Sequence, residues 1–526
     1  MRAQINFNRT FKDIHDLVII AGGERRKVLN ESSGHYKVGY DDHNLTYKYF
    51  DESTLNKPIR GTEALNKSFS FNAPRPPFTN VEDRYVSFYG NASYTYNNRL
   101  SASASIRMDQ SNLFGTDPKY QYRPLWSAGL QYVVFENKWS WLERLSARIT
   151  YGINGNISKK SGPYLIAKSW PYGPNYLINE NYTYISTPPN SGLRWEKTKV
   201  TNIGLDFQLL GKRLNGTVEY YSKNTSDLLG EKDADPTLGW SSVMMNYGDM
   251  RNRGIEISLR SRNIDRPDFK WNSDFIFSYN KNKVTNIKDP STSAASYYSE
   301  LQAREGYPLN ALFSVRYAGL DENGAPTAYT KDGEIVGSTS ELTKDDLVFS
   351  GTYDPKYNAS FSNTFSYKGI DLSLMFVYYG GHVMRDVGAT MYLTHPHTAY
   401  TTNLDRDNLN YWKTPADSKD IHMHPAYSYN EDSDVENIWR AADIHIQKGD
   451  FIKLRDITLG YTLPRIWTER CRLQKVRIDF QIQNVWRWAA NDNKLDPEVW
   501  SGGEIYSIDR GDLTPTTYTL GLTVNF

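Results

Sequence analysis

Apolar and polar residues alternate along most of this chain. The clearest case is the segment 357–367, where Tyr357, Ala359, Phe361, Phe365 and Tyr367 share one face and mainly polar residues share the other. A short YKG turn follows, and IDLSLMFVYYG alternates again. A period of two residues is typical of a β-strand with one apolar and one polar face. The pattern therefore predicts a hairpin with two long arms.

The same alternation predicts about fifteen strands. They are expected near 2–12, 15–26, 84–96, 99–108, 121–134, 143–153, 197–209, 213–226, 250–263, 268–281, 355–367, 370–382, 450–463, 474–486 and 515–526. Most have about the ten residues that a tilted strand needs to cross a bilayer. Strands of soluble sandwiches are shorter, at about five or six residues.

Short and long connections alternate strictly between these strands. The short ones lie near 13–14, 97–98, 135–142, 210–212, 264–267, 368–369 and 464–473, and the long ones fill 27–83, 109–120, 154–196, 227–249, 282–354, 383–449 and 487–514. Turns at one rim and loops at the other are typical of outer-membrane barrels. Bacterial single-chain barrels have even strand numbers. The odd count therefore predicts an all-β chain that forms part of a transmembrane antiparallel β-barrel, with long external loops and short periplasmic turns.

Composition is compatible with a membrane barrel. The mean hydropathy is −0.64, as expected where lipid-facing and lumen-facing residues alternate. With 61 basic and 60 acidic residues the net charge is +1, which gives no field to attract nucleic acid. Cys471 is the only cysteine, so a disulfide framework is excluded. The N-terminal MRAQINFNRTF lacks the features of a secretion signal.

Several segments together resemble one family. They include RAQINFNRTF, HDLVIIAGGE, ASIRMDQSNLFG, LSARITYGINGN, LRWEKTKVTNIGLDFQLLGKRLNGTVEYYSKNTSDLL, NYGDMRNRGIEISL, FSYKGIDLSLMFVYYGG, FIKLRDITLGYTLP and TYTLGLTVNF. In order and spacing, the chain resembles the SusC/RagA-type TonB-dependent outer-membrane transporters along nearly its whole length.

This resemblance implies a place and a function. Residues 1–526 are expected to supply the C-terminal part of a receptor barrel, about 15 of 22 strands, in the outer membrane of a Gram-negative bacterium. The signal peptide, TonB box, plug and first strands of the family are expected to be absent from this chain. The implied function is import of oligosaccharides or peptides. The implied partners are TonB, acting through the missing plug region, and a SusD-like surface lipoprotein that serves as a lid.

The C-terminal strand carries a second implication of the resemblance. TYTLGLTVNF alternates to its end, with Tyr518 and Phe526 on the apolar side. A terminal aromatic residue of this kind resembles the signal that the outer-membrane assembly machinery reads. An ordinary terminal strand would account for the alternation but not for the abrupt stop.

Aromatic residues outside the strands are the candidate contacts to substrate or lid. They are Trp170, Tyr172, Tyr176, Tyr182, Trp412, Trp439 and Trp488. Flat amphipathic rings give a receptor contact area at low entropic cost. The competing interpretation is that these rings pack the loops together or join the aromatic girdle of the barrel.

Polar residues on the strands are expected to face the lumen or the plug. They are Glu219 with Lys223, Glu256 with Arg260, Arg477 with Asp479, and Gln481 with Gln483.

Catalytic and metal chemistry find little support in the sequence. The pairs His395 with His397 and His422 with His424 lack the third ligand of a zinc-protease helix. The NEDSDVEN stretch lacks the glycine and closing glutamate of a calcium-binding EF-hand loop. We therefore expect no catalytic residue, no metal and no cofactor.

Two alternatives to a working importer stay open at this stage. One is a truncated, nonfunctional barrel fragment. The other is a soluble all-β carbohydrate-binding protein or enzyme, which would need paired carboxylates about 5 to 9 Å apart if it were a glycosidase.

Overall fold

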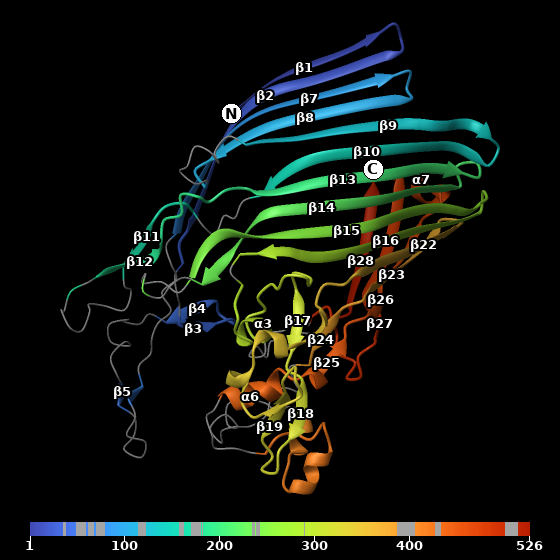
Figure 1. Cartoon of the computed structure of the whole chain (residues 1–526). Helices are drawn as coiled ribbons and strands as arrows, with labels where there is room; N and C mark the ends of the chain where they lie inside the picture. The colour runs from blue at the N-terminus through green and yellow to red at the C-terminus, as the bar shows by residue number, and fades with distance from the viewer. Residues whose placement is uncertain are drawn as a thin grey trace.

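A computed structural model places the backbone in one large antiparallel sheet (Figure 1). It describes residues 1–34, 38–48, 59–60, 68–69, 79–113, 123–156, 162–169, 180, 182–233, 237, 242–288, 290–386, 406–426, 433–499 and 514–526. Fifteen strands follow one another in sequence order across this sheet, each paired with its neighbours in the chain.

The strands of the sheet have the following bounds. They are β1 (Arg2–Phe11), β2 (His15–Ser32), β7 (Thr79–Tyr96), β8 (Leu100–Ser111), β9 (Pro124–Trp139), β10 (Leu142–Asn156), β13 (Glu196–Leu209), β14 (Leu214–Asp233), β15 (Ser242–Asp265), β16 (Phe269–Ile287), β22 (Tyr357–Tyr367), β23 (Ile370–Gly380), β26 (Phe451–Thr462), β27 (Lys475–Ala489) and β28 (Thr517–Asn525). All fifteen predicted strands are confirmed. The sheet curls strongly, so that its last strands lie behind its middle strands in Figure 1.

The two faces of the sheet differ in chemistry. In the paired strands β10 and β13, Ile149 lies opposite Ile203, and both side chains are almost half exposed. Their neighbours Arg148 and Asn202 point to the opposite face, where polar residues collect. An apolar outer band and a polar interior are the pattern of a barrel that crosses a membrane.

Tight turns join the strands at one rim. In the turn between β7 and β8, Asn97 and Asn98 both have positive φ, and Arg99 N–H donates to the Tyr96 carbonyl at 3.0 Å. Lys368 and Gly369 have the same signs of φ between β22 and β23. Positive φ at both central residues defines the type I′ turn, whose twist matches that of paired strands.

The predicted connection at 135–142 is shorter than expected. Strand β9 runs on to Trp139 and β10 starts at Leu142, so only residues 140–141 join them. The connection at 464–473 contains a short helix, α7 (Arg465–Arg470). No described helix has the length and apolar character needed to cross a membrane.

The other rim carries the long connections. Four small hairpin strands lie in the first of them, β3 (Val38–Asp41), β4 (Thr46–Lys48), β5 (Ile59–Arg60) and β6 (Ser68–Phe69), and two lie in the third, β11 (Ile166–Ser169) and β12 (Thr183–Thr187). Strands β14 and β15 extend well beyond the predicted ends at 226 and 250 and pair as far as Asp233 with Ser242.

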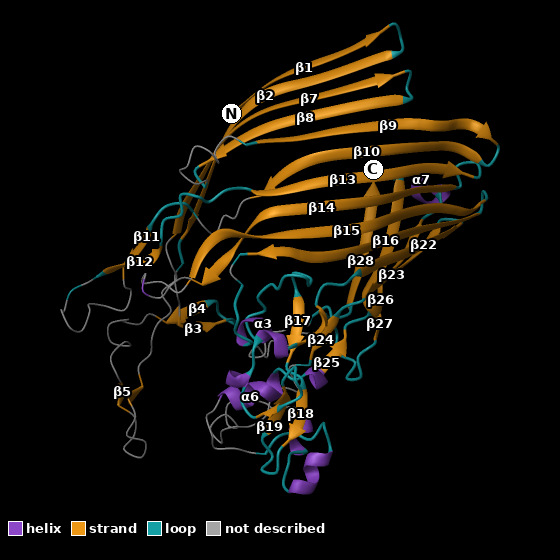
Figure 2. Ribbon diagram, viewed as in Figure 1, coloured by secondary structure: helices purple, strands orange, loops and turns teal. Residues whose placement is uncertain are grey.

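The described parts of connections 288–356 and 381–450 fold together, and we call them the loop cluster (Figure 2). Its elements are α3 (Ala295–Tyr298), β17 (Ala311–Ser314), β18 (Tyr317–Leu320), β19 (Pro326–Tyr329), β20 (Ile335–Val336), η2 (Thr339–Glu341), η3 (Lys344–Asp346), β21 (Val348–Thr352), β24 (Val383–Arg385), η4 (Arg406–Leu409), η5 (Pro415–Lys419), α6 (Ser433–Arg440), η6 (Asp443–His445) and β25 (Ile446–Lys448). Phe313, Tyr317 and Trp439 are buried in its apolar core. The two connections thus behave as one small folded unit at the loop rim.

The sheet does not close on itself within the described residues. Among these residues, strand β1 pairs only with β2, and β28 pairs only with β27. On β28 the outward side chains Tyr518, Leu520 and Leu522 are each about two-thirds or more exposed. Two sheet edges are therefore left open in the described part of this chain.

A charge placed on the outer face tests the assignment of the two faces. We expect Ile149→Arg, in the middle of β10, to lower the free energy of unfolding in lipid vesicles by about 2 to 4 kcal/mol, because the charge enters hydrocarbon. Denaturant unfolding in vesicles measures the loss. Thr150→Arg, one residue along on the polar face, is the matched control and should change stability little. Equal losses in both variants would contradict the assignment.

Candidate functional site

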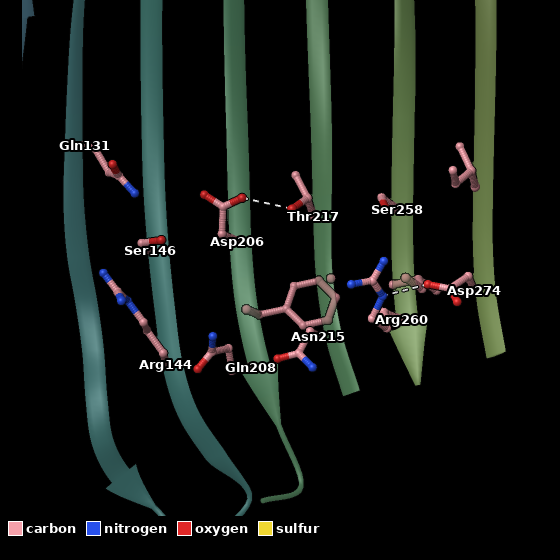
Figure 3. A pocket seen from close by; sticks show the side chains of 14 residues that line it. Gln131, Arg144, Ser146, Asp206, Gln208, Asn215, Thr217, Ser258, Arg260 and Asp274 are labelled. Atoms are coloured by element: carbon pink, nitrogen blue, oxygen red, sulfur yellow. Dashed lines mark hydrogen bonds and ion pairs between the residues drawn. The ribbon is translucent and has the colours of Figure 1, made fainter. Parts of the chain in front are cut away.

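A cavity lies on the polar face of the sheet, near the turn rim (Figure 3). It has a volume of about 650 Å³ and is lined by strands β9, β10, β13, β14, β15 and β16. We call its polar lining the lumen wall: Gln131, Arg144, Ser146, Asp206, Gln208, Asn215, Thr217, Ser258, Arg260 and Asp274. Alternate residues of each strand point to the same face, so these neighbouring strands contribute their polar side chains to one surface.

Ion pairs and hydrogen bonds link the lumen wall to polar side chains farther along the same strands. Arg148 on β10 pairs with Glu219 on β14 and lies 3.8 Å from Asp206 on β13. The Asn202 amide donates to Glu219 at 3.0 Å, and Thr217 Oγ1 donates to Asp206 at 2.9 Å. Each carboxylate therefore has donors from two directions, which fixes the spacing of polar groups along the wall.

Further pairs show which polar-face predictions the structure realises. Arg477 and Asp479, which were expected on the polar face, contact each other at 2.8 Å, and Arg477 also contacts Asp371 on β23 at 2.5 Å. Arg260 pairs with Asp274 on the next strand at 2.7 Å. Sequence reasoning missed cross-strand partners such as Arg148, because they depend on strand register. The order of the strands and the length of each turn fix the register between neighbouring strands, and that register would have identified these partners.

A second polar network lies where the last long connection meets the loop rim. Lys453 on β26 donates to Asp496 at 2.8 Å and also contacts Glu498; the Lys453 and Asp496 side chains are 5% and 4% exposed. Arg487 lies 2.8 Å from Asp496, and Arg455 contacts Glu498.

This network sets the charge state of its acids. Burial alone would raise the pKa of Asp496, but hydrogen bonds from Lys453 and Arg487 hold that pKa below its usual value. The network therefore fastens residues 491–499 to the inner face of β26 and β27.

The structure describes four of the seven predicted contact residues; Trp170, Tyr172 and Tyr176 lie outside the described residues. Trp439 is 1% exposed in the core of the loop cluster, and Trp412 packs against that core while donating to Ser418 at 2.9 Å. Tyr182 is half-buried beside β12. Contact with substrate or lid stays a prediction for all seven, although burial of Trp439 and Trp412 agrees with the packing alternative.

Two predicted aromatic positions lie on the outer face. Trp488 on β27 pairs with Ile452 and is almost half exposed, in line with Trp486. Tyr518 stacks on Phe480 with ring centroids 6.4 Å apart. Phe526 is largely exposed at the end of the chain, and its role as an assembly signal stays a prediction.

The histidine pairs were predicted to have no metal-binding role. His395 and His397 lie outside the described residues, whereas His422 and His424 line a cavity in the loop cluster. Among the residues that the structure describes, no group of three or more His, Cys, Asp or Glu could hold a metal ion.

A family model described as TonB dependent receptor-like, beta-barrel matches residues 4–485. This chain belongs to that family. The receptor chain also resembles TonB-dependent receptor P3 of Formosa agariphila, with 25% identity over 508 residues that cover 91% of the chain and 47% of P3. TonB-dependent receptor SusC of Bacteroides thetaiotaomicron is 27% identical over 480 residues, which cover 84% of the chain and 44% of SusC.

Solved structures support the fold of the receptor chain. The structure of the RagAB peptide transporter matches with a TM-score of 0.75 at 21% identity, covering all of this chain and 55% of the other. The receptor chain is therefore of the SusC/RagA type, and it is an outer-membrane protein of a Gram-negative bacterium. It spans about half the length of the curated relatives it matches. Membership in a family of receptors disfavours the soluble alternative.

Removal of the Arg148 guanidinium tests the ion pairs that adjoin the lumen wall. We expect Arg148→Gln to lower the free energy of unfolding in vesicles by about 1 kcal/mol, since two carboxylates lose a partly exposed cation. The difference should shrink in high salt, which screens the lost attraction. Arg260→Gln is the control, because that side chain is 76% exposed, and it should change stability little. A larger loss for Arg260→Gln than for Arg148→Gln would contradict the assigned network.

The Lys453 network gives a second prediction. We expect Lys453→Met to lower the free energy needed to open segment 491–499 by about 3 kcal/mol. This value is at the low end of the loss measured when one partner of a buried ion pair is removed, because Arg487 and Arg455 still contact the two acids. Protease added to intact cells should then cleave this segment faster. Lys448→Met, an exposed lysine of β25, is the control. Equal cleavage of both variants would rule out the anchoring role.

Proposed function

We propose that this chain forms the C-terminal part of the barrel of a TonB-dependent importer for oligosaccharides or peptides. The observation that carries the proposal is the division of one long sheet into an apolar outer face and a polar, ion-paired inner face. A sheet with these faces encloses a hydrated interior in the membrane. The family of the chain supports import as the purpose of that interior, and so does its likeness in fold to a peptide transporter.

We further propose that the complete protein supplies the strands that pair with β1 and β28, together with a plug. Support comes from the two open edges and from relatives about twice as long as this chain. The lumen wall offers a plug the hydrogen-bonding groups it would need, with Asp206, Asp274 and Arg260 at the turn rim. TonB would act on this plug region from the periplasm.

The loop rim is the proposed site of the external partners. A SusD-like surface lipoprotein would cover the rim as a lid, and substrate would be held beneath it. The loop cluster supports this role because it has its own apolar core and can therefore present a fixed surface above the membrane. The outer-membrane assembly machinery and the surrounding lipid complete the proposed partners.

A truncated, nonfunctional fragment is the second candidate, and the open edges favour it if no further strands exist. An antibody to β27 and β28 separates the two in isolated outer membranes. We expect a species near twice 60.5 kDa, because the chain covers 47% and 52% of P3 and P39 of Formosa agariphila. In the same cells, uptake of a labelled glycan or peptide mixture should require both this protein and TonB. A species at 60.5 kDa without such uptake would support the fragment.

A further inference from the structure

A separate cavity of about 320 Å³ lies in the loop cluster, far along the chain from the lumen wall. Ligand sites range from about 300 to 1,000 Å³, so this cavity suits one small ring or side chain. The lining residues that matter below are Asp386, Asn410, Trp439, His445, Gln447 and Asn493. They come from connection 381–450 and from the segment that Lys453 anchors.

Backbone pairing sets the position of the polar groups in this cavity. Strands β24 and β25 pair with Met384 opposite Gln447, and the Asp386 N–H donates to the His445 carbonyl at 2.9 Å. The Asn493 amide donates to the Asp386 carboxylate. Two chain segments 107 residues apart therefore meet at the Asp386 carboxylate.

His445 presents a buried acceptor. The residue is 5% exposed, and its Nε2 has no hydrogen-bond partner among the described residues. The Trp439 backbone acts as a hydrogen-bond partner of the ring, and we assign the ring proton to Nδ1 because Nε2 has no partner among the described residues. With the proton on Nδ1, Nε2 carries the lone pair. Burial lowers the pKa of His445 to about 3, so the ring stays neutral and Nε2 stays an acceptor near pH 7.

An acceptor that is buried without a donor destabilises the folded protein, so a ligand that donates a hydrogen bond to this nitrogen would be favoured in the cavity. The described lining has no lysine or arginine; it holds the Asp386 carboxylate, the amides of Asn410 and Gln447, and the further imidazoles of His422 and His424. An anion would be repelled by Asp386. A molecule with several hydroxyl groups can donate to His445 and Asp386 and also pair with the amides.

We propose that this cavity binds one neutral sugar unit through hydroxyl donors to His445 Nε2 and the Asp386 carboxylate. The proposal rests on the proposed import function and narrows its substrate to glycans. A metal is disfavoured, since no described group of three ligands has the geometry to hold one.

Binding to the complete purified protein in detergent tests the proposal. The probes are neutral monosaccharides and disaccharides, a set of dipeptides, the core oligosaccharide of the cell's own lipopolysaccharide, and zinc alone, each titrated by calorimetry. We expect at least one neutral sugar to bind. His445→Leu should weaken that binding about tenfold or more, because a ligand hydroxyl loses its acceptor, whereas His445→Gln keeps an acceptor and should bind within about threefold.

His382→Leu is the matched control. His382 is also a buried histidine of connection 381–450 with an unpartnered ring nitrogen among the described residues, but it lies outside the cavity lining. This variant should bind sugar like the unmodified protein. Heat-modifiable migration on gels confirms that each variant is folded.

Several outcomes would overturn the proposal. They are sugar binding that is unchanged in His445→Leu, binding of dipeptides or zinc alone, or no binding of any probe, which would leave the cavity to water. Binding of the core oligosaccharide but of no other sugar would assign the site to the cell's own surface glycan. If His445→Leu binds sugar normally while TonB-dependent glycan uptake persists, the sugar site is refuted and the import function is retained. If cells with the unmodified protein take up no glycan or peptide, the import function itself is refuted.

Discussion

The rule that no backbone N–H or C=O can stay unpaired in hydrocarbon governs this structure. Each unsatisfied group costs several kcal/mol in lipid, and the sheet meets the rule by pairing strands with their neighbours in sequence. Strands β22 and β23 pair without interruption from Tyr357 with Gly380 to Tyr367 with Ile370. Type I′ turns such as Lys368-Gly369 let the second strand pair from its first residue. Topology, turn chemistry and strand length all follow from this need.

The ion pairs of the inner face and those of the loop rim differ in how far they are buried. On the inner face at mid-strand, the Arg148 pairs are partly exposed and contribute modestly. At the loop rim a covering segment buries Lys453 with Asp496, and the low local dielectric makes loss of a partner costly. In the loop cluster Arg385 is fully buried and donates to the Phe313 carbonyl at 2.9 Å. Polar contacts are therefore partly exposed on the inner face of the strands, and buried where they join segments at the loop rim.

Sequence reasoning predicted the sheet well because lipid imposes a period of two. All fifteen strands were found, yet β14 and β15 continue past their predicted ends, since strand residues outside the bilayer have no lipid face to keep apolar. The site was less predictable. Partners such as Arg148 and Glu219 are 71 residues apart and depend on register. His445 was not singled out, because its unpaired nitrogen arises only when connection 381–450 folds on itself.

The open edges require partners for a physical reason. Strand β28 has nine residues, and alternate residues of an edge strand direct both backbone groups outward. Roughly eight groups at several kcal/mol each give tens of kcal/mol, whereas folded domains are stable by only about 5 to 15 kcal/mol. Side-chain packing cannot offset such a deficit. The proposed importer meets this need if strands from elsewhere pair with β1 and β28 where the sheet lies in the membrane.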